Sequence, residues 1–369
     1  MAASDTRAEA PFQRRLRRLG RAMAADKRLA ALVLSSATGV PVVRPLVLRL
    51  RLLLACDARC RMCLVHSPLR TADLYDAEEL RALMPAALAA RLMDEGRALG
   101  ATVLNLQGGE PFLHPAFGDI LGHGLGLGFA VQFFTNGGEA ADIAAVERAL
   151  ARARGRARIA LRVSIDGVGA AHDAIRGVPG AYRRALAFIR AGRRLAGRDK
   201  RLQLGVSCTV LRDNAGEVLA LADHFASLGL AARFFPVVGY GPRRHDGAIV
   251  AAPFLPPDVL PDRRQQRAIA RALPALERHP GVEYAGVLRA APALWGGQAV
   301  RNICLSNSIG IYVTATGRLQ FCPISADTVG SVAATPLAAA WTDLMAAPRR
   351  ESFASCLVPC TCYRPEALL

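Results

Sequence analysis

The sequence predicts an α/β fold, a partial (β/α)6 barrel of the TIM type with a small C-terminal domain made of a β-hairpin and a helix. Three observations support this prediction. Apolar runs typical of buried strands alternate with helical patterns between residues 45 and 240. The alternation repeats six times, which implies parallel strands joined by right-handed crossovers. Near the C-terminus, two short strand patterns flank the turn Ala315-Thr316-Gly317 and predict a hairpin.

The elements of the barrel follow from this pattern in chain order. Strands are expected at 45–55, 102–106, 129–134, 158–165, 202–210 and 232–238. Helices are expected at 76–99, 115–125, 139–154, 182–196 and 216–228. Asp76 is placed to cap the first helix, because a carboxylate there accepts hydrogen bonds from free backbone N–H groups.

The composition changes after the sixth strand. Residues 239–257 are rich in glycine, proline and charge and indicate a connection, and a basic helix is expected at 262–279. The C-terminal hairpin is expected to pair 308–314 with 318–322. We therefore divide the chain into a basic helical extension, the barrel, a helical bridge and the C-terminal domain, at 1–44, 45–240, 241–300 and 301–369.

The net charge of +17 does not by itself indicate a nucleic-acid substrate. Nearly all of the positive charge is arginine, since the only lysines are Lys27 and Lys200. Together with abundant alanine, this bias is typical of a GC-rich genome, and arginines dispersed over helix faces are usually solvated. We do not expect nucleic acid as a partner. Basic residues between 14 and 28 predict an amphipathic helix across the bottom of the barrel, with an acidic peptide or a membrane surface as alternative partners.

The ends of the chain and its cysteines indicate a cytoplasmic protein. The N-terminus lacks a cleavable signal pattern, and the apolar stretch 29–43 is broken by serine, glycine and proline. It falls short of the roughly 20 residues that a membrane-spanning helix needs. Eight of the nine cysteines are grouped at 56–63 and 304–362, which favours metal binding in a reducing compartment over disulfides.

The first cysteine group has the spacing Cys56-x3-Cys60-x2-Cys63, directly after the first expected strand. Three thiolates on one loop are suited to bind three irons of a [4Fe–4S] cluster and leave the fourth iron open. A structural zinc site usually needs four ligands, which this loop does not supply. A disulfide interpretation leaves one thiol unpaired.

The residues that follow this loop resemble the landmarks of the radical S-adenosylmethionine (radical SAM) enzymes. They appear in order at expected strand ends: Gly108-Gly109-Glu110-Pro111, Thr135-Asn136-Gly137, Ser164-Ile165-Asp166-Gly167, Arg176-Gly177 and Asn214. The resemblance covers about residues 45 to 240. It implies that the chain binds S-adenosylmethionine (SAM) at the open iron and cleaves it reductively to a 5′-deoxyadenosyl radical.

The resemblance also implies roles for individual residues. Gly108, Gly109 and Glu110 would contact the ammonium group of SAM, and Arg176 would pair with its carboxylate. Further contacts are expected from Ser164 and Asp166 to the ribose, from Met62 to the adenine, and from Thr135, Asn136 and Asn214. Turns and a helix cap are the alternative explanations for the glycine motifs and for Asn214.

The C-terminal cysteines are similar to the SPASM or Twitch extensions of radical SAM enzymes, which hold auxiliary Fe–S clusters. Cys304-x12-Gly317-x4-Cys322 matches the opening of such a domain, and Cys356, Cys360 and Cys362 follow near the terminus. Five cysteines are enough for one auxiliary [4Fe–4S] cluster with one to spare, and which of the last three is idle stays open. A zinc knuckle on the same thiols is the alternative.

An auxiliary cluster favours oxidative chemistry, such as a cross-link or a dehydrogenation. The first hypothesis is therefore the maturation of a ribosomal peptide, with flavodoxin or ferredoxin as the reducing partner. The alternative is a dehydrogenase or epimerase acting on a sugar, nucleoside or aminoglycoside. RNA modification and a non-catalytic Fe–S carrier rank lower. Tyr240, His245, Asp246 and Cys208 are weak candidates for a proton or hydrogen donor, and we name no catalytic base.

Overall fold

The structure is a computed structural model, and it describes residues 45–67, 75–245, 248–253, 255–296, 310–320 and 328–346. The expected N-terminal extension lies outside these residues. So do Asp246 and all five C-terminal cysteines, Cys304, Cys322, Cys356, Cys360 and Cys362. For Tyr240 and His245 only the backbone is described.

The six predicted barrel strands are confirmed. They are β1 (Val47–Leu53), β2 (Val103–Gly108), β3 (Ala130–Thr135), β4 (Arg158–Ser164), β5 (Leu202–Val210) and β6 (Ala231–Pro236). Neighbouring strands pair in parallel, in the order in which they occur in the chain. Their carboxyl ends therefore meet at one edge of the sheet, where active sites of such folds lie.

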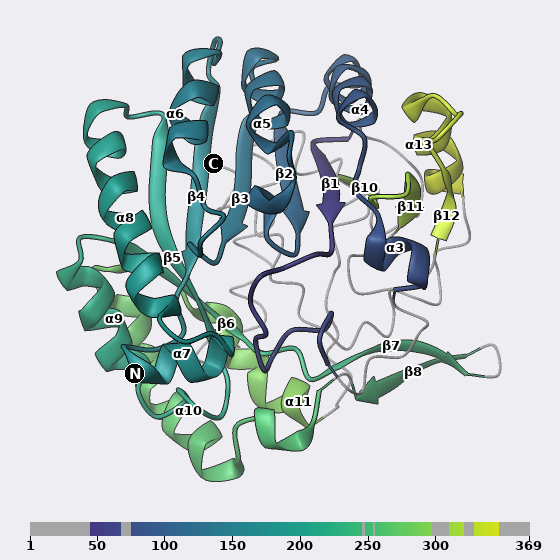
Figure 1. Ribbon diagram of the computed structural model, residues 1–369. Helices are drawn as coiled ribbons and strands as arrows, with labels where there is room; N and C mark the ends of the chain where they lie inside the picture. Colours follow the sequence, from purple (N-terminus) through teal and green to yellow (C-terminus); the bar gives the residue numbers. More distant parts are fainter. Residues whose placement is uncertain are drawn as a thin grey trace, which may run out of the picture.

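Helices fill the crossovers, and those other than the short α7 (Ala170–Arg176) cover the outer face of this sheet (Figure 1). The crossover helices are α4 (Ala86–Ala98), α5 (Phe117–Gly126), α6 (Ile143–Ala151), α7, α8 (Ala181–Arg198) and α9 (Val218–Ser227). The helix expected at 262–279 is present as α10 (Arg263–Arg278), with a capping box between Asp262 and Gln265. No helix in the described ranges is both long and apolar enough to cross a membrane.

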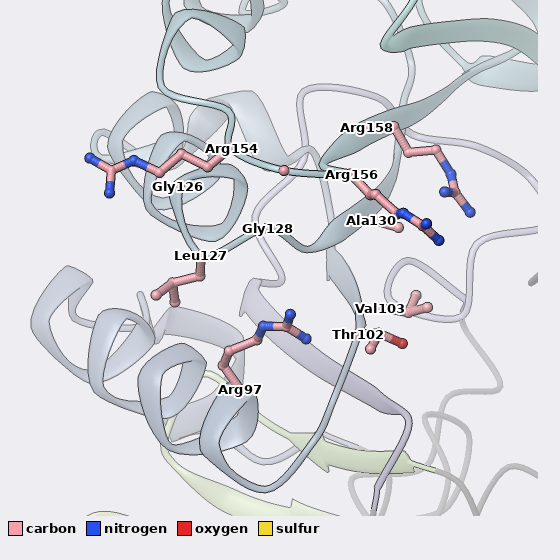
Figure 2. Close-up of a pocket in the computed structure, with 11 residues that line it drawn as sticks. Arg97, Thr102, Val103, Gly126, Leu127, Gly128, Ala130, Arg154, Arg156 and Arg158 are labelled. Carbon is pink, nitrogen blue, oxygen red and sulfur yellow. The ribbon is translucent and has the colours of Figure 1, made fainter.

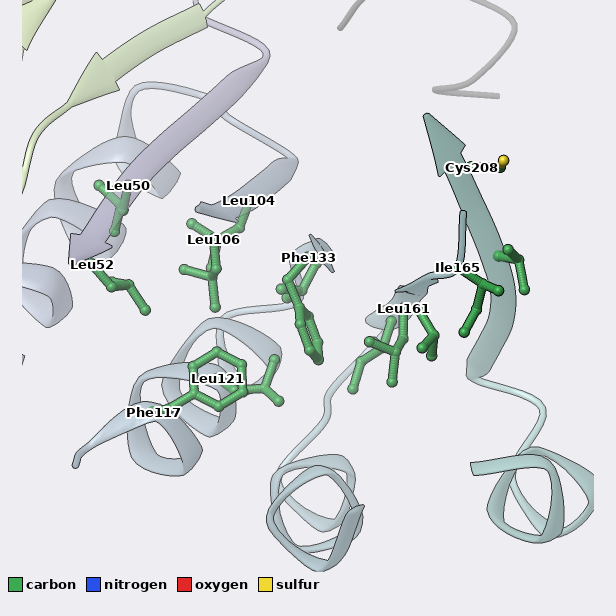
Figure 3. Packing of buried hydrophobic residues seen from close by; sticks show 14 of the residues in the cluster. Leu50, Leu52, Leu104, Leu106, Phe117, Leu121, Phe133, Leu161, Ile165 and Cys208 are labelled. Atoms are coloured by element: carbon green, nitrogen blue, oxygen red, sulfur yellow. The ribbon is translucent and has the colours of Figure 1, made fainter. Parts of the chain in front are cut away.

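Alternate strand residues build the core between sheet and helices. Leu50 and Leu52 of β1 are fully buried, as are Leu104 and Leu106 of β2. Figure 3 shows these side chains in one cluster with Phe117 and Leu121 of α5, Phe133 of β3 and Leu161 of β4. Burial of one such side chain contributes about 1.5–3 kcal/mol, so this layer fixes the strands whose ends carry the functional residues.

The prediction of a single helix at 76–99 is wrong. A short helix, α3 (Ala77–Arg81), comes first, and α4 starts only after Pro85. Asp76 does cap α3, since its side chain accepts a hydrogen bond from the N–H of Glu79 at 2.8 Å. Between the two helices the chain returns to β1, where the N–H of Met84 donates to the carbonyl of Leu52 at 2.8 Å. Proline disfavours a helical conformation at the preceding residue, and the bond to β1 stabilises the break.

The expected connection at 239–257 contains two strands, β7 (Tyr240–His245) and β8 (Ala248–Pro253), which form an antiparallel hairpin. Figure 1 shows this hairpin apart from the main sheet, on the side toward which the arrows of β1 and β2 point. The hairpin was not predicted because its sequence contains proline and glycine. Both residues are unusual in central strands but tolerated in a two-stranded ribbon. The short strand β9 (Val282–Tyr284), which pairs with β6, was also not predicted.

The C-terminal hairpin is confirmed as β10 (Gly310–Val313) and β11 (Arg318–Gln320), which are antiparallel. Its turn has Gly317 at φ +80°, a conformation that favours glycine. β10 pairs in parallel with β1, so the hairpin continues the main sheet. A further strand, β12 (Thr328–Ser331), and the helix α13 (Leu337–Ala346) follow. The described residues thus give a ten-stranded sheet in the order β12-β11-β10-β1-β2-β3-β4-β5-β6-β9.

Candidate functional site

A cavity of about 240 Å3 opens at the carboxyl ends of the parallel strands, and strands β1 to β5 or the loops that follow them all contribute to it. Its lining residues are Leu54, Cys56, Ala58, Cys60, Met62, Cys63, Val65, Gly108, Gly109, Glu110, Phe134, Thr135, Asn136, Ser164, Arg176 and Thr209. The cavity thus brings together landmarks from Cys56 to Arg176, which lie up to 120 residues apart in the sequence, and we take it as the candidate site.

The cysteine loop forms one wall of this cavity. Cys56, Cys60 and Cys63 are half-buried, and none of them has a disulfide partner among the residues that the structure describes. The backbone of the loop is attached to the end of α7, because the N–H of Arg59 donates to the carbonyl of Arg176 at 2.9 Å. Gly177 follows with φ +66°, and a Cβ there would lie 2.6 Å from the carbonyl oxygen of Arg59. The Arg176-Gly177 landmark is therefore also a docking surface for the cysteine loop.

A side chain of the cysteine loop also connects the loop to two neighbouring segments. Arg61 forms ion pairs with Asp213, after β5, at 2.7 Å, and with Asp258 at 2.8 Å. Asp258 belongs to the 3-10 helix η2 (Pro257–Val259). These pairs are partly exposed and worth little stability individually, but they restrict the segment between Cys60 and Met62.

Gly108 and Gly109 bring the end of β2 against the end of β1. The N–H of Gly109 donates to the carbonyl of Leu53 at 3.0 Å, and that of Glu110 to Ala55 at 3.0 Å. A Cβ on Gly109 would lie 2.1 Å from the carbonyl oxygen of Ala55. No other residue fits this approach without moving the start of the cysteine loop.

The carboxylate of Glu110 is buried at the base of the cavity. It accepts hydrogen bonds from the hydroxyl of Thr135 at 2.9 Å and from the N–H of Asn136 at 2.8 Å. Burial raises the pKa of Glu110 to about 7, and these hydrogen bonds oppose the rise. At a pH of about 7 the protonated and ionised forms of Glu110 are therefore about equally populated. A nearby cation would favour the ionised carboxylate.

Arg176 and Asp166 form a buried ion pair with 2.5 Å between the nearest atoms. Asp166 also accepts a hydrogen bond from the N–H of Thr209 at 2.7 Å. Burial by itself lowers the pKa of Arg176, but the negative charge of Asp166 and the interactions with Cys60 and Cys208 together outweigh that effect and hold the pKa above its ordinary value. Arg176 is thus a permanent cation at the wall of the cavity, 3.5 Å from the sulfur of Cys60.

Two predicted site residues do not line the cavity. Asp166 is fully buried, and its carboxylate faces Arg176 and Thr209. Asn214 is also buried, and its amide donates to the backbone carbonyls of Asp166 and Thr209, both at 2.8 Å. Asp166 thus pairs with Arg176, and Asn214 links the backbone at the ends of β4 and β5, while the contact of Asp166 with a ribose stays a prediction.

Sequence reasoning also missed residues of the site. Phe134 of β3, next to the predicted Thr135, lines the cavity. Thr209, one residue before the end of β5, lines it as well. Phe134 is 39% exposed, which is unusual for so large an apolar side chain. Its place one residue before Thr135 was the available signal. Cys208, a weak candidate for a hydrogen donor, is fully buried, and its sulfur lies 3.8 Å from the amide of Asn214.

The donor set of the cavity fits a [4Fe–4S] cluster and SAM. Within the described ranges, no three His, Cys, Asp or Glu side chains converge closely enough to hold one metal ion. A cluster makes a different demand, because its cysteine ligands bind separate irons. Burial raises the pKa of Cys56 to about 12 and the pKa of Cys60 above its ordinary value, whereas bound metal deprotonates a thiol outright. The three sulfurs open onto the cavity that also contains the glycine turn, a carboxylate and a guanidinium.

Comparison with known proteins agrees with this site. The chain is 36% identical over 145 residues to the AdoMet-dependent heme synthase of Methanosarcina barkeri, which is 39% of each protein. It is 31% identical over 181 residues to the pre-heme d1 synthase of Dinoroseobacter shibae, which is 46% of this chain and 38% of that protein. The chain resembles the radical SAM enzymes in sequence and in fold. It spans about two fifths of the length of these two relatives, and no family model matches it.

Solved structures show the same fold at low sequence identity. Streptococcus suis SuiB bound to its precursor peptide SuiA superposes with a TM-score of 0.56 at 13% identity, over 85% of this chain and 68% of SuiB. Native anSMEcpe with bound AdoMet gives a TM-score of 0.54 at 14% identity, over 84% of this chain and 83% of anSMEcpe. The predicted partial barrel is therefore confirmed as a radical SAM fold.

Proposed function

We propose that this chain is a radical SAM enzyme that binds a [4Fe–4S] cluster on Cys56, Cys60 and Cys63 and SAM in the adjoining cavity. The observation that carries the proposal is the shared cavity. The three cysteines open onto the same space as Gly109, Glu110 and other landmarks that follow strands β2 to β4. When bound, the cluster and SAM supply a low-potential electron and a 5′-deoxyadenosyl radical that abstracts a hydrogen atom from the substrate.

The residues of the chain then have defined tasks. Glu110 offers a carboxylate to the ammonium group of SAM, and that cation lowers the pKa of Glu110 from about 7. The hydroxyl of Thr135 and the N–H of Asn136 hold this carboxylate in place. Ser164 lines the cavity and is placed to bind a ribose hydroxyl, while Met62 offers an apolar contact for the adenine.

Arg176 serves both the cofactor and the cysteine loop. Its guanidinium, held by Asp166, is suited to bind the carboxylate of SAM. The same cation lies 3.5 Å from the sulfur of Cys60, where it stabilises the thiolate form. Asp166 is therefore proposed as a positioning residue that acts through Arg176.

Iron analysis and SAM cleavage test this proposal together. The wild type, reconstituted without oxygen and reduced with dithionite, should convert SAM to 5′-deoxyadenosine. The Cys56→Ala/Cys60→Ala/Cys63→Ala variant should lose this activity together with about four irons per chain. Cys208→Ala is the matched control, because Cys208 is buried outside the loop. Equal iron content and activity in the triple variant would refute the proposal.

For the substrate, we propose a ribosomal peptide that is oxidised in natural-product maturation. The fold similarity to SuiB, solved with a precursor peptide, supports this class at the level of the fold alone. The substrate would lose a hydrogen atom to the radical and then an electron and a proton. Four of the five cysteines of the proposed 301–369 domain, Cys304, Cys322 and two of Cys356, Cys360 and Cys362, are proposed to hold the auxiliary [4Fe–4S] cluster that accepts this electron. A cytoplasmic flavodoxin or ferredoxin is the proposed reductant for the first cluster.

A small molecule is the second candidate substrate, because both curated relatives are named as heme synthases. One experiment separates the two classes. The reconstituted enzyme is incubated with SAM and either short peptides encoded beside its gene or porphyrins, and the release of 5′-deoxyadenosine is followed. A peptide that accelerates this release and loses two hydrogen atoms by mass spectrometry supports maturation. Acceleration by a porphyrin alone would replace the peptide with the second candidate.

A further inference from the structure

A second and larger cavity lies at the opposite ends of the strands. Its volume is about 440 Å3, within the range of small-molecule sites. It is bounded by the starts of β2, β3 and β4, by the end of α4 and by the loops that follow α5 and α6. The lining residues are Arg97, Thr102, Val103, Gly126, Leu127, Gly128, Ala130, Arg154, Gly155, Arg156 and Arg158.

The charged residues of this cavity are all arginines. Figure 2 shows the side chains of Arg97, Arg156 and Arg158 extending to the side of the cavity where Thr102 and Val103 lie, whereas that of Arg154 points away. In the described part of the chain, none of these four arginines has an ion pair with an acidic residue. Neighbouring arginines differ in this respect, since Arg152 pairs with Asp119 at 3.3 Å.

The local backbone holds the arginines in place. The N–H of Arg154 donates to the carbonyl of Leu125 at 3.1 Å, and the carbonyl of Arg154 accepts from the N–H of Ala157 at 3.1 Å. Arg97 donates to the carbonyl of Ala101 at 3.0 Å, and its guanidinium lies 5.8 Å from the centre of the Phe129 ring. The fold therefore brings together positive charges from the end of α4, the loop after α6 and the start of β4.

We propose that this cavity binds a small polyanion with two or more phosphate groups, such as an inorganic polyphosphate or the phosphates of a nucleotide. Several guanidinium groups around one cavity repel one another, and an anion removes that cost. Guanidinium forks match phosphate oxygens in two-point hydrogen bonds. Arg97 and the pair Arg156 and Arg158 come from different elements, so a ligand with more than one anionic group offers a separate partner to each.

The shape of the site favours a small ligand over a nucleic acid. The lining of this cavity also includes apolar residues, Val103, Leu127 and Ala130, and the hydroxyl of Thr102 adds a hydrogen-bonding group. The phosphate backbone of a nucleic acid is bound instead along extended basic surfaces. This site lies at the strand ends opposite the candidate SAM cavity, so the two are tested separately.

Calorimetric titration of the full chain with magnesium-free tripolyphosphate, and with ATP in a second arm, tests the proposal. Arg156→Ala/Arg158→Ala should weaken the binding of both ligands at least about tenfold, because a hydrogen bond to a charged group contributes about 1.5–3 kcal/mol. The control is Arg267→Ala/Arg271→Ala on α10, which removes the same charge from exposed positions and should bind like the wild type. Arg97→Gln is a second test that leaves the loop after α6 intact.

Each result of these titrations either supports or overturns the proposed polyanion site. Loss of binding in both cavity variants but not in the control supports the site, and tighter binding of ATP than of tripolyphosphate would identify nucleotides as the source of the phosphates. Equal loss in the control would show nonspecific attraction and overturn the proposal. Binding of single-stranded RNA without binding of tripolyphosphate or ATP would also overturn it. SAM cleavage by the cavity variants should equal that of the wild type, which separates this test from that of the proposed function.

Discussion

The guanidinium of Arg176 lies 3.5 Å from the sulfur of Cys60. The same side chain forms a 2.5 Å ion pair with Asp166. The backbone carbonyl of Arg176 accepts a hydrogen bond from the N–H of Arg59 in the cysteine loop. One residue at the end of α7 therefore supports the loop through both its backbone and its charge. The first prediction concerns this arrangement.

Replacing Arg176 with leucine should lower the free energy of unfolding by about 3–5 kcal/mol, because it leaves the fully buried Asp166 without its partner. The double variant Arg176→Leu/Asp166→Leu should recover part of this loss, since both charges are then absent. Urea unfolding of the single and double variants in a double-mutant cycle measures the coupling. Additive effects of the two substitutions would contradict the pairing.

Gly109→Ala should displace the cysteine loop. The new methyl group would lie 2.1 Å from the carbonyl oxygen of Ala55, immediately before Cys56. We expect a loss of at least half of the iron bound after reconstitution. Gly197→Ala on α8 is the matched control, because nothing lies within 4 Å of its added Cβ, and alanine favours a helix by roughly 0.5–1 kcal/mol. Full iron content in Gly109→Ala would show that the loop accommodates the methyl group.

Glu110 should make the metal-free protein less stable as the pH rises. Its folded pKa of about 7 lies above the ordinary value of 4.5, so between these pH values the folded state binds more protons than the unfolded state. The contribution is fully present below pH 4.5 and is lost as the pH approaches 7, a total of about 3 kcal/mol. Urea unfolding of wild type and Glu110→Gln between pH 4.5 and 7.5 measures it. The difference in stability between the two proteins should change with pH by this amount, and parallel pH profiles would contradict the prediction.

Glu283 on β9 should stabilise the end of the sheet. Its carboxylate accepts hydrogen bonds from Arg162 at 2.6 Å and from Arg233 at 2.7 Å, and Arg162 is almost fully buried. Glu283→Ala should lower the free energy of unfolding by about 2–4 kcal/mol, because Arg162 then has no counter-charge. Glu277→Ala on α10 is a suitable control, since its partner Arg289 is exposed. Thermal unfolding of both variants provides the comparison, and equal shifts would refute the role of Glu283.

Some parts of this protein were beyond what sequence patterns predict. The break at Pro85 depends on a backbone bond from Met84 to β1, and the β7–β8 hairpin contains residues that disfavour strands in general. The contacts of Asp166 were also not predictable. A motif shows that a carboxylate follows β4, but its partners, Arg176 and Thr209, come from other elements.

Sequence patterns are enough to predict the alternation of strands and helices and the order of the landmarks from Cys56 to Asn214. These follow from local periodicity, and parallel strands bring residues at their carboxyl ends to one edge of the sheet. The tertiary structure determines which of those residues line the cavity, that Arg176 pairs with Asp166, and that arginines from α4, from the loop after α6 and from β4 line a second cavity at the opposite strand ends. Burial, ion pairing and the meeting of separate loops depend on contacts between segments far apart in the chain, and no local pattern encodes them.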